Sequence, residues 1–299
     1  MSTDVGGARL RSGKPSGTAG VTALLRAVDA AQRPRRRLTD DRFAHHFAER
    51  SPRFRYYAAN PSAAAVSLTA FDRLFAGFVA EILLRVVHFD AELAAAAERG
   101  VEQVLLVGAG YEATAQRHPE LAGLRFFEVD HPATQRAKLA VLGQAGVPTD
   151  GVTYLPVDLE TQRLDAALAG TGFDPGRPTI VGWHGVTFFL RPAAFRTALA
   201  DLATVCAPGS RLVFDYMDAA VVDGTTPYAA ARRVARAGGK RGEPYSMGLT
   251  APSALAAAAD AGFAEVETLR VPELVDRFAR PRAPVRRDDF MGVVTVDRV

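Results

Sequence analysis

The chain has 299 residues, of which 48% are apolar and 23% are charged, as in an ordinary globular protein. Its formal net charge is only +3, and its one cysteine, Cys206, excludes an internal disulfide. The sequence has no run of the roughly 18–20 apolar residues that a membrane helix needs, and its start lacks the apolar centre of a signal peptide. We therefore expect a cytoplasmic protein without a membrane partner.

The first third of the chain predicts helices. Residues 1–17 lack hydrophobic periodicity and are expected to form a disordered tail. Apolar side chains recur at helical spacing from Thr18 to Ala31 and from Ser62 to Glu98, with a proline-bracketed connector, 52–61, before the second stretch. A helical cap over residues 18–100 is therefore expected to precede the first strand.

Basic and imidazole side chains gather in this cap. Arginine occupies positions 33, 35, 36 and 37, and His45 is followed directly by His46. Without interleaved aromatic residues or a nucleic-acid motif, the arginines predict a solvated face rather than a nucleic-acid partner. The two histidines could line a substrate pocket, although a solvated helix face is the favoured interpretation. No histidine spacing matches a metal motif such as His-Glu-x-x-His, so no metal site is predicted.

The stretch from Val104 to Asp130 is the most informative part of the sequence. An apolar run, 104–107, leads into Gly108-Ala109-Gly110, and a second apolar run ends at Asp130. Glycines allow a tight turn close to a ligand, and an acid about 20 residues further on can bind ribose hydroxyls. The pattern predicts an α/β fold that holds an adenosine-containing cofactor.

Strands and helices continue to alternate after this stretch. Further strands are expected at Val152–Val157, Thr179–Trp183 and Arg211–Tyr216, with helices at 133–144, 161–168 and 192–206. Such alternation predicts a parallel, doubly wound sheet. Two last strands, Ala264–Leu269 and Phe290–Val296, lack an obvious long helix between them and suggest a closing antiparallel pair. Residues 217–250 are expected to form an insertion.

Candidate site residues coincide with predicted strand ends. Ligands of open α/β sheets lie at the carboxyl ends of the strands. Six residues fall at such ends: Gly108, Gly110, Asp130, Asp158, His184 and Asp215. Four weaker candidates for a substrate pocket, with simple packing as the alternative, are Tyr111, Phe188, Asp215 and Tyr216.

Four segments carry a resemblance to a known family: Val107–Gly110, Phe127–Pro132, Pro156–Leu159 and Trp183–Leu190. In order and spacing they resemble the leucine carboxyl methyltransferase-like family of S-adenosylmethionine-dependent methyltransferases, many of whose bacterial members are tailoring O-methyltransferases of polyketides. The resemblance covers about residues 18–299. It implies one domain: a helical cap and a class I methyltransferase-like Rossmann core, 101–299, whose seven-stranded sheet has its last strand antiparallel.

The resemblance also implies roles for particular residues. Gly108–Gly110 would pass close to the methionine part of S-adenosyl-L-methionine, and Asp130 would hold the ribose hydroxyls. Asp158 and the backbone of Leu159 would meet the adenine. Arg85 would pair with the cofactor carboxylate, a role that suits a planar guanidinium.

Two positions depart from the family pattern. The aspartate usual after the glycine turn is Glu112 here, and the glutamate usual before Gly-Val is His184. The second change removes a carboxylate that would help to hold the cofactor's ammonium group. It also supplies an imidazole, which is suited to proton transfer near neutral pH. His184 is therefore the candidate catalytic base for a hydroxyl acceptor; the alternative is a histidine satisfied by the backbone at a strand end.

The predicted activity is methyl transfer to a carboxylate or hydroxyl of a small, polyketide-like natural product. A NAD-dependent dehydrogenase is one alternative, since Gly108-x-Gly110-x-x-Ala113 satisfies the looser dinucleotide fingerprint. Another is a methyltransferase fold that binds the cofactor but catalyses a cyclisation or isomerisation. The sequence leaves open the identity of the acceptor and the choice between a monomer and a homodimer.

Overall fold

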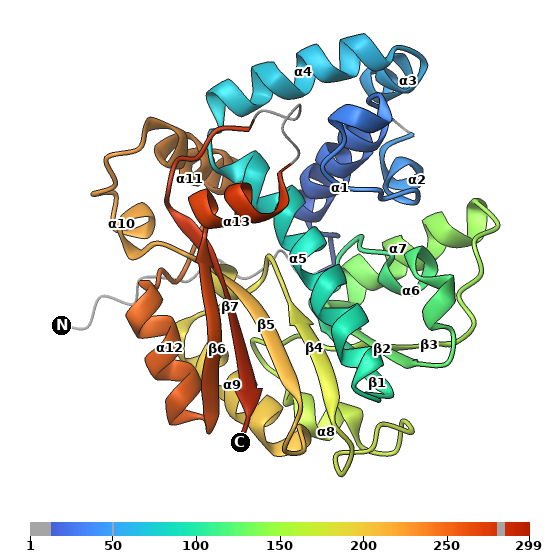
Figure 1. Ribbon diagram of the computed structural model, residues 1–299, viewed down its shortest axis with the longest axis vertical. Helices are drawn as coiled ribbons and strands as arrows, with labels where there is room; N and C mark the ends of the chain where they lie inside the picture. The colour runs from blue at the N-terminus through green and yellow to red at the C-terminus, as the bar shows by residue number, and fades with distance from the viewer. Residues whose placement is uncertain (1–12, 50, 280–284) are drawn as a thin grey trace.

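The structure, a computed structural model, describes residues 13–49, 51–279 and 285–299. A twisted sheet forms the lower part of the molecule, and a group of helices lies above it (Figure 1). Most of the predicted disordered tail, residues 1–12, lies outside the described residues, whereas Gly17 already begins the first helix.

The sheet has seven strands in the order β3-β2-β1-β4-β5-β7-β6. Their bounds are β1 Gln103–Val107, β2 Arg125–Asp130, β3 Val152–Pro156, β4 Thr179–Trp183, β5 Arg211–Met217, β6 Phe263–Arg270 and β7 Met291–Arg298. Strands β1 to β5 are parallel, and β7 lies antiparallel between β5 and β6. The predicted fold class is confirmed. The strand order reverses between β1 and β4, which is where open α/β sheets bind ligands.

Helices cover both faces of the sheet, which explains the continuous apolar runs of β1 and β4. One face packs against α5 Phe78–Glu98 and α13 Val271–Phe278, and the other against α8 Leu164–Leu168, α9 Pro192–Val205 and α12 Ala251–Asp260. Helix α7, Pro132–Gln144, is joined to β2 by the buried ion pair of Lys138 and Glu128.

The cap contains more helix than the sequence predicted. It is built from α1 Gly17–Ala30, α2 Ala44–Ala48, α3 Pro52–Ala59, α4 Pro61–Leu74 and the first half of α5. Segment 52–61 was predicted as a connector, but Ser51 caps α3 by accepting from Phe54 N, and Pro52 occupies the first helical position. The long helical stretch breaks at Gly77, whose φ of +81° and close approach to Asp288 exclude a side chain.

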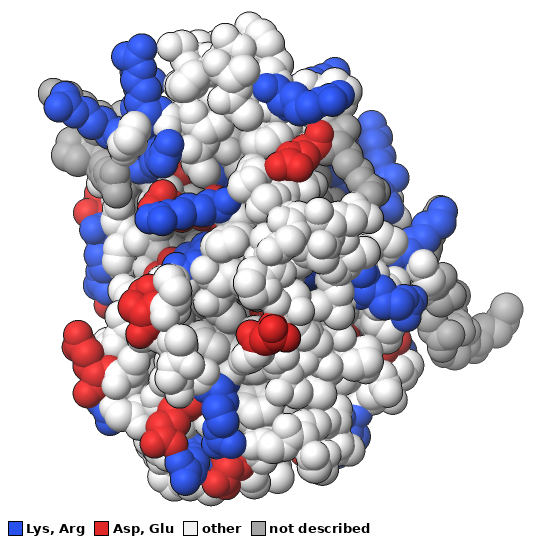
Figure 2. Space-filling view, turned by 90° about the vertical axis from the view of Figure 1, so that its right-hand side faces the viewer, with Lys and Arg blue, Asp and Glu red and all other residues white. Residues whose placement is uncertain are grey.

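The last third of the chain adds helices that the sequence pattern did not reveal. The insertion 217–250 contains α10 Ala219–Val222 and α11 Ala229–Arg241, and α13 separates the two terminal strands. The short elements α6 Thr114–Arg117, η1 Pro34–Arg36, η2 Pro119–Leu121 and η3 Thr187–Phe189 complete the described structure. Among the described helices, none is long and apolar enough to cross a membrane. On the face shown in Figure 2, basic side chains stand in separate groups with acidic ones among them.

Candidate functional site

A cavity opens at the carboxyl ends of β1, β2, β3 and β4, beneath the start of α1. All seven residues predicted to bind the cofactor line it: Arg85, Gly108, Ala109, Gly110, Asp130, Asp158 and Leu159. His184 and Tyr111 line it as well. Four of the five sequence stretches that share this cavity follow parallel strands, whose carboxyl ends lie at the same edge of the sheet, and the fifth, Arg85, comes from α5.

The glycine turn after β1 has backbone angles that favour glycine. Gly108 has a φ of +67° and Gly110 a φ of +52°. A Cβ on Gly108 would lie 2.1 Å from a methyl group of Val186, so packing within the protein requires glycine at this position. The turn is held to β2 by a hydrogen bond from Gly110 N to the carboxylate of Asp130.

Asp130 presents an organised carboxylate to the cavity. Its Oδ1 also accepts from the backbone N of His131 at 2.6 Å. Burial raises the pKa of Asp130 to about 6, against the opposing effect of these backbone donors. A carboxylate has about four acceptor positions, so two remain for further donors such as the hydroxyls of a ribose.

The turn after β3 places Asp158 and Leu159 at the cavity wall. Asp158 Oδ1 accepts from the backbone N of Glu160 at 3.0 Å, and the backbone N of Asp158 donates to the side chain of Gln162 at 2.8 Å. The turn is therefore fixed by its own side chains, which gives the cavity a preformed edge.

Arg85 is held from behind by two buried acids. Its Nη1 lies 2.6 Å from Asp215 Oδ2 and 3.2 Å from both carboxyl oxygens of Glu81. Burial raises the pKa of Glu81 and of Asp215, and the Asp215 carboxylate raises that of Glu81 further, so the pair favours one shared proton and one negative charge beside Arg85. Arg85 also has a buried Nε without a partner among the described residues. This orphaned donor fits a site that receives an anionic ligand group.

His184 follows β4 beside Arg85. Its ring packs edge-on against Phe89 with 5.1 Å between centroids, and its buried Nε2 has no partner among the described residues. Burial, together with the charge of Arg85, holds the pKa of His184 well below 6.5. The imidazole is therefore neutral at neutral pH.

Three of the four weaker candidates do not line the cavity. Asp215 lies behind Arg85, where its carboxylate also accepts from Gly185 N. Tyr216, the next residue along β5, points to the opposite face of the sheet and packs over Gly292, because side chains alternate along a strand. Phe188 is buried against Phe189 and Tyr245, and Phe189 lines the cavity in its place.

The roof of the cavity was missed by sequence reasoning. The carboxylate of Glu243, in the insertion, accepts from the backbone N of Gly17 and of Thr18, both at 2.8 Å, and from the Thr18 hydroxyl. The two backbone N–H groups belong to the first turn of α1 and have no acceptor within the helix. No local pattern links positions 18 and 243; only the fold brings them together.

The departure at Glu112 has a structural explanation. Glu112 lies 2.9 Å from Nη1 of the buried Arg26 of α1, and Nη2 of Arg26 donates to the carbonyl oxygen of Tyr111. The glycine turn and the cap are thereby joined by a charged contact. The ring of Tyr111 in turn stacks on Phe47 of α2, with centroids 4.8 Å apart.

Comparisons with known proteins agree with this geometry. The leucine carboxyl methyltransferase profile matches residues 19–203. A candidate S-adenosyl-L-methionine-dependent methyltransferase of Mycolicibacterium vanbaalenii is 36% identical over 162 residues, 53% of each chain. Another, from Parafrankia sp., is 36% identical over 216 residues, 68% of this chain and 65% of that protein. The matches thus span from about half to two thirds of the length of these relatives.

Solved structures show the same fold. A candidate methyltransferase from Thermobifida fusca superposes with a TM-score of 0.57 at 15% identity, over 96% of each chain. A duf574 family protein from Streptomyces avermitilis gives a TM-score of 0.55 at 18% identity, over 79% of this chain and 91% of that one.

The fold and the cavity define a Rossmann-like α/β protein with a ligand cavity at the switch point of its sheet. The chain belongs to the leucine carboxyl methyltransferase family, whose relatives named above are described as S-adenosyl-L-methionine-dependent. The predicted family is confirmed, and membership of this family disfavours the dehydrogenase alternative.

Proposed function

We propose that this chain transfers a methyl group from S-adenosyl-L-methionine to a carboxylate or hydroxyl oxygen of a small, polyketide-like natural product. The observation that supports this most strongly is that every residue assigned to the cofactor by the family pattern lines one cavity at the switch point of the sheet.

Each wall of the cavity suits one part of the cofactor. Asp130 has acceptor capacity for the ribose hydroxyls, and the turn at Asp158 and Leu159 borders the space for adenine. The backbone of Gly108–Gly110 allows close approach of the methionine part, and Nε of Arg85, which has no partner among the described residues, is a donor for its carboxylate. When bound, the cofactor supplies an electrophilic methyl group.

The basicity of His184 helps to distinguish a carboxylate acceptor from a hydroxyl acceptor. A carboxylate acceptor is already anionic and needs only alignment with the methyl group, whereas a hydroxyl must lose its proton. Since burial and Arg85 keep the pKa of His184 well below its usual range, the ring is a weak base. This favours a carboxylate acceptor; for a hydroxyl acceptor, His184 is the residue placed to take the proton.

Binding and turnover are tested separately. Calorimetric titration of the full chain is expected to show S-adenosyl-L-methionine binding and none of NAD. Incubation with methyl-labelled cofactor and a panel of aromatic carboxylic acids and phenols is then expected to yield labelled product and S-adenosylhomocysteine. The chain could instead bind S-adenosyl-L-methionine tightly and convert a substrate without releasing S-adenosylhomocysteine. That result would contradict methyl transfer and favour the cyclase or isomerase alternative.

A further inference from the structure

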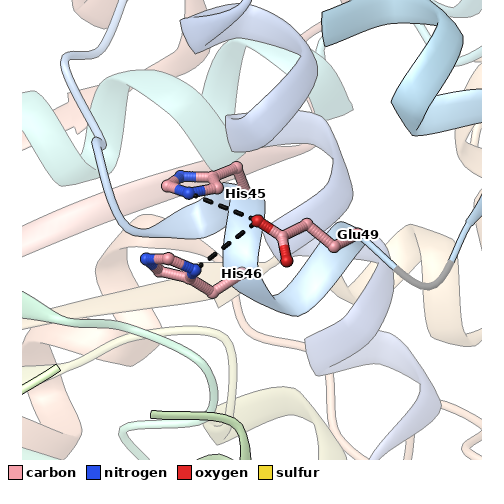
Figure 3. A group of neighbouring side chains, drawn as sticks. All are labelled: His45, His46 and Glu49. Carbon is pink, nitrogen blue, oxygen red and sulfur yellow. Dashed lines mark ion pairs between the residues drawn. The ribbon is translucent and has the colours of Figure 1, made fainter. Parts of the chain in front are cut away.

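A second group of ligand-type side chains lies on the cap. His45 and His46 belong to α2, and Glu49 follows at the end of that helix. Both imidazoles face one carboxylate oxygen of Glu49 (Figure 3): its Oε1 lies 3.4 Å from His45 Nε2 and 3.6 Å from His46 Nδ1. The three residues are absent from the lining of the cofactor cavity, so methyl transfer leaves them without a role.

Two of the three separations between these atoms match a tetrahedral metal site. Zinc bonds to imidazole nitrogen and carboxylate oxygen are roughly 2.0–2.2 Å long, so neighbouring ligand atoms around a tetrahedral ion lie about 3.3–3.6 Å apart. Both measured separations from Glu49 are close to this range, and the three ligand atoms all lie within 4.8 Å of one another. Small side-chain rotations would bring the set to coordination distance.

His45 is already oriented as a ligand. Its Nδ1 lies 2.7 Å from the carbonyl oxygen of Arg42. A carbonyl oxygen only accepts, so Nδ1 carries the hydrogen and the neutral ring has its lone pair on Nε2, the atom that faces Glu49. In metal-bound histidines the ring nitrogen that does not bind the metal commonly donates its hydrogen to a backbone carbonyl, a carboxylate or water.

We propose that His45, His46 and Glu49 bind one Zn²⁺ ion or a chemically similar transition-metal ion, with water completing the coordination. Two imidazoles and one carboxylate suit Zn²⁺, Co²⁺, Ni²⁺ or Cu²⁺, and disfavour Mg²⁺ and Ca²⁺, which prefer oxygen ligands alone. The side chains of His45 and Glu49 are 42% and 54% exposed, so the ion reaches them directly from solvent.

Metal binding would act on the cofactor cavity through the same helix. Phe47, between the ligands, stacks on Tyr111 of the glycine turn. An ion that joins three side chains across a five-residue helix restricts its local unfolding. The site is therefore a structural one that stabilises α2, the helix whose Phe47 contacts the glycine turn.

The test is titration of the full-length, chelator-treated chain with ZnCl₂, CoCl₂ and MgCl₂, followed by calorimetry and visible absorption. The expected result is one Zn²⁺ per chain with a micromolar Kd, a visible Co²⁺ spectrum of tetrahedral type, and no Mg²⁺ binding. Thermal melting should shift upward as Zn²⁺ is added.

Two variants and a matched control locate the site. His46→Ala and Glu49→Ala should each weaken Zn²⁺ binding at least tenfold and abolish the Co²⁺ absorption. Glu120→Ala is the control, because Glu120 accepts from a histidine, His118, at 2.8 Å without a second imidazole nearby, and it should bind Zn²⁺ as the parent does. Glu49 and Glu120 are exposed, so circular dichroism of their variants should be unchanged, and the Glu49 variant tests the site without altering the half-buried His46. No Zn²⁺ binding by the parent, or equal binding by all variants, overturns the proposal.

Discussion

The guanidinium of Arg85 lies 2.6 Å from the carboxylate of Asp215, and the same carboxylate accepts from the backbone N of Gly185. A Cβ on Gly185 would lie only 2.8 Å from Nη2 of Arg85. Asp215 thus fixes the arginine and the turn after β4 in one arrangement. Asp215 was a weak candidate for the substrate pocket. It is absent from the lining of the cavity and holds Arg85, which lines it.

This relationship predicts a non-additive effect on stability. In the Glu81→Gln variant Asp215 still balances Arg85, so we expect a loss of only about 1 kcal/mol. In Asp215→Asn, Glu81 can ionise and supply the negative charge that balances Arg85, so we expect a similarly small loss. The double variant leaves a buried arginine uncompensated and should lose about 3–5 kcal/mol. Urea denaturation of all three measures this; Glu102→Gln, in an exposed ion pair with Arg177, is the control and should be near neutral. Strict additivity would contradict the proton-sharing arrangement.

Loss of the Asp130 carboxylate should abolish cofactor binding. The Asp130→Ala variant removes both the ribose acceptor and the group that holds Gly110 N. Calorimetry with S-adenosylhomocysteine should therefore show at least a hundredfold weaker binding, which corresponds to about 2.7 kcal/mol. Asp150→Ala, at an exposed loop position, should bind normally. Unchanged affinity of the Asp130 variant would place the ribose elsewhere.

Cofactor affinity should fall at acidic pH. The pKa of Asp130 is raised to about 6 in the folded protein, and ribose hydroxyls donate to its ionised form. Binding therefore favours deprotonation, so affinity is full above pH 6 and declines below it, by up to about tenfold per pH unit. Calorimetric titrations with the cofactor from pH 5 to pH 8 test whether affinity rises with pH in this way. In Asp130→Asn the residual affinity should be independent of pH over this range; the same slope there would assign the titration to another group.

Replacing His184 should affect turnover more than binding. Its Nε2 is buried, and its ring is neutral because the pKa is well below 6.5. The His184→Ala variant should retain cofactor affinity within about threefold, or about 0.7 kcal/mol. With a hydroxyl acceptor its turnover should fall about 10²-fold or more, whereas a carboxylate acceptor should be affected far less. A large loss of cofactor affinity would instead show that His184 holds the cofactor.

Glu243 should keep the roof of the cavity closed. The Glu243→Ala variant leaves the first backbone donors of α1 without their carboxylate, at a cost of about 1–2 kcal/mol. Hydrogen exchange in residues 13–30 should accelerate, and cofactor dissociation should become faster. Asp223→Ala, an exposed acid in the same insertion, is the control. Unchanged exchange in α1 would mean that the roof is held by other contacts.

The sequence by itself determined the order of the core elements and much of the cofactor cavity. Parallel strands buried on both faces must be continuously apolar, so β1 and β4 were predicted at or near their observed bounds. The positive φ of Gly108 and of Gly110 is a backbone requirement that is local in the chain. The helices α3 and α13 escaped prediction because each has 8 residues, fewer than the roughly 11–18 residues over which helical periodicity is recognised.

Only the tertiary structure decided which side chains face one another. Alternation along β5 sends Asp215 behind Arg85 and Tyr216 to the opposite face, a choice that depends on which face of the strand each layer of helices covers. The contact of Glu243 with Thr18 joins positions that are 225 residues apart. Such pairs leave no local pattern, since the free energy that forms them comes from packing between elements and not from the chain around each residue.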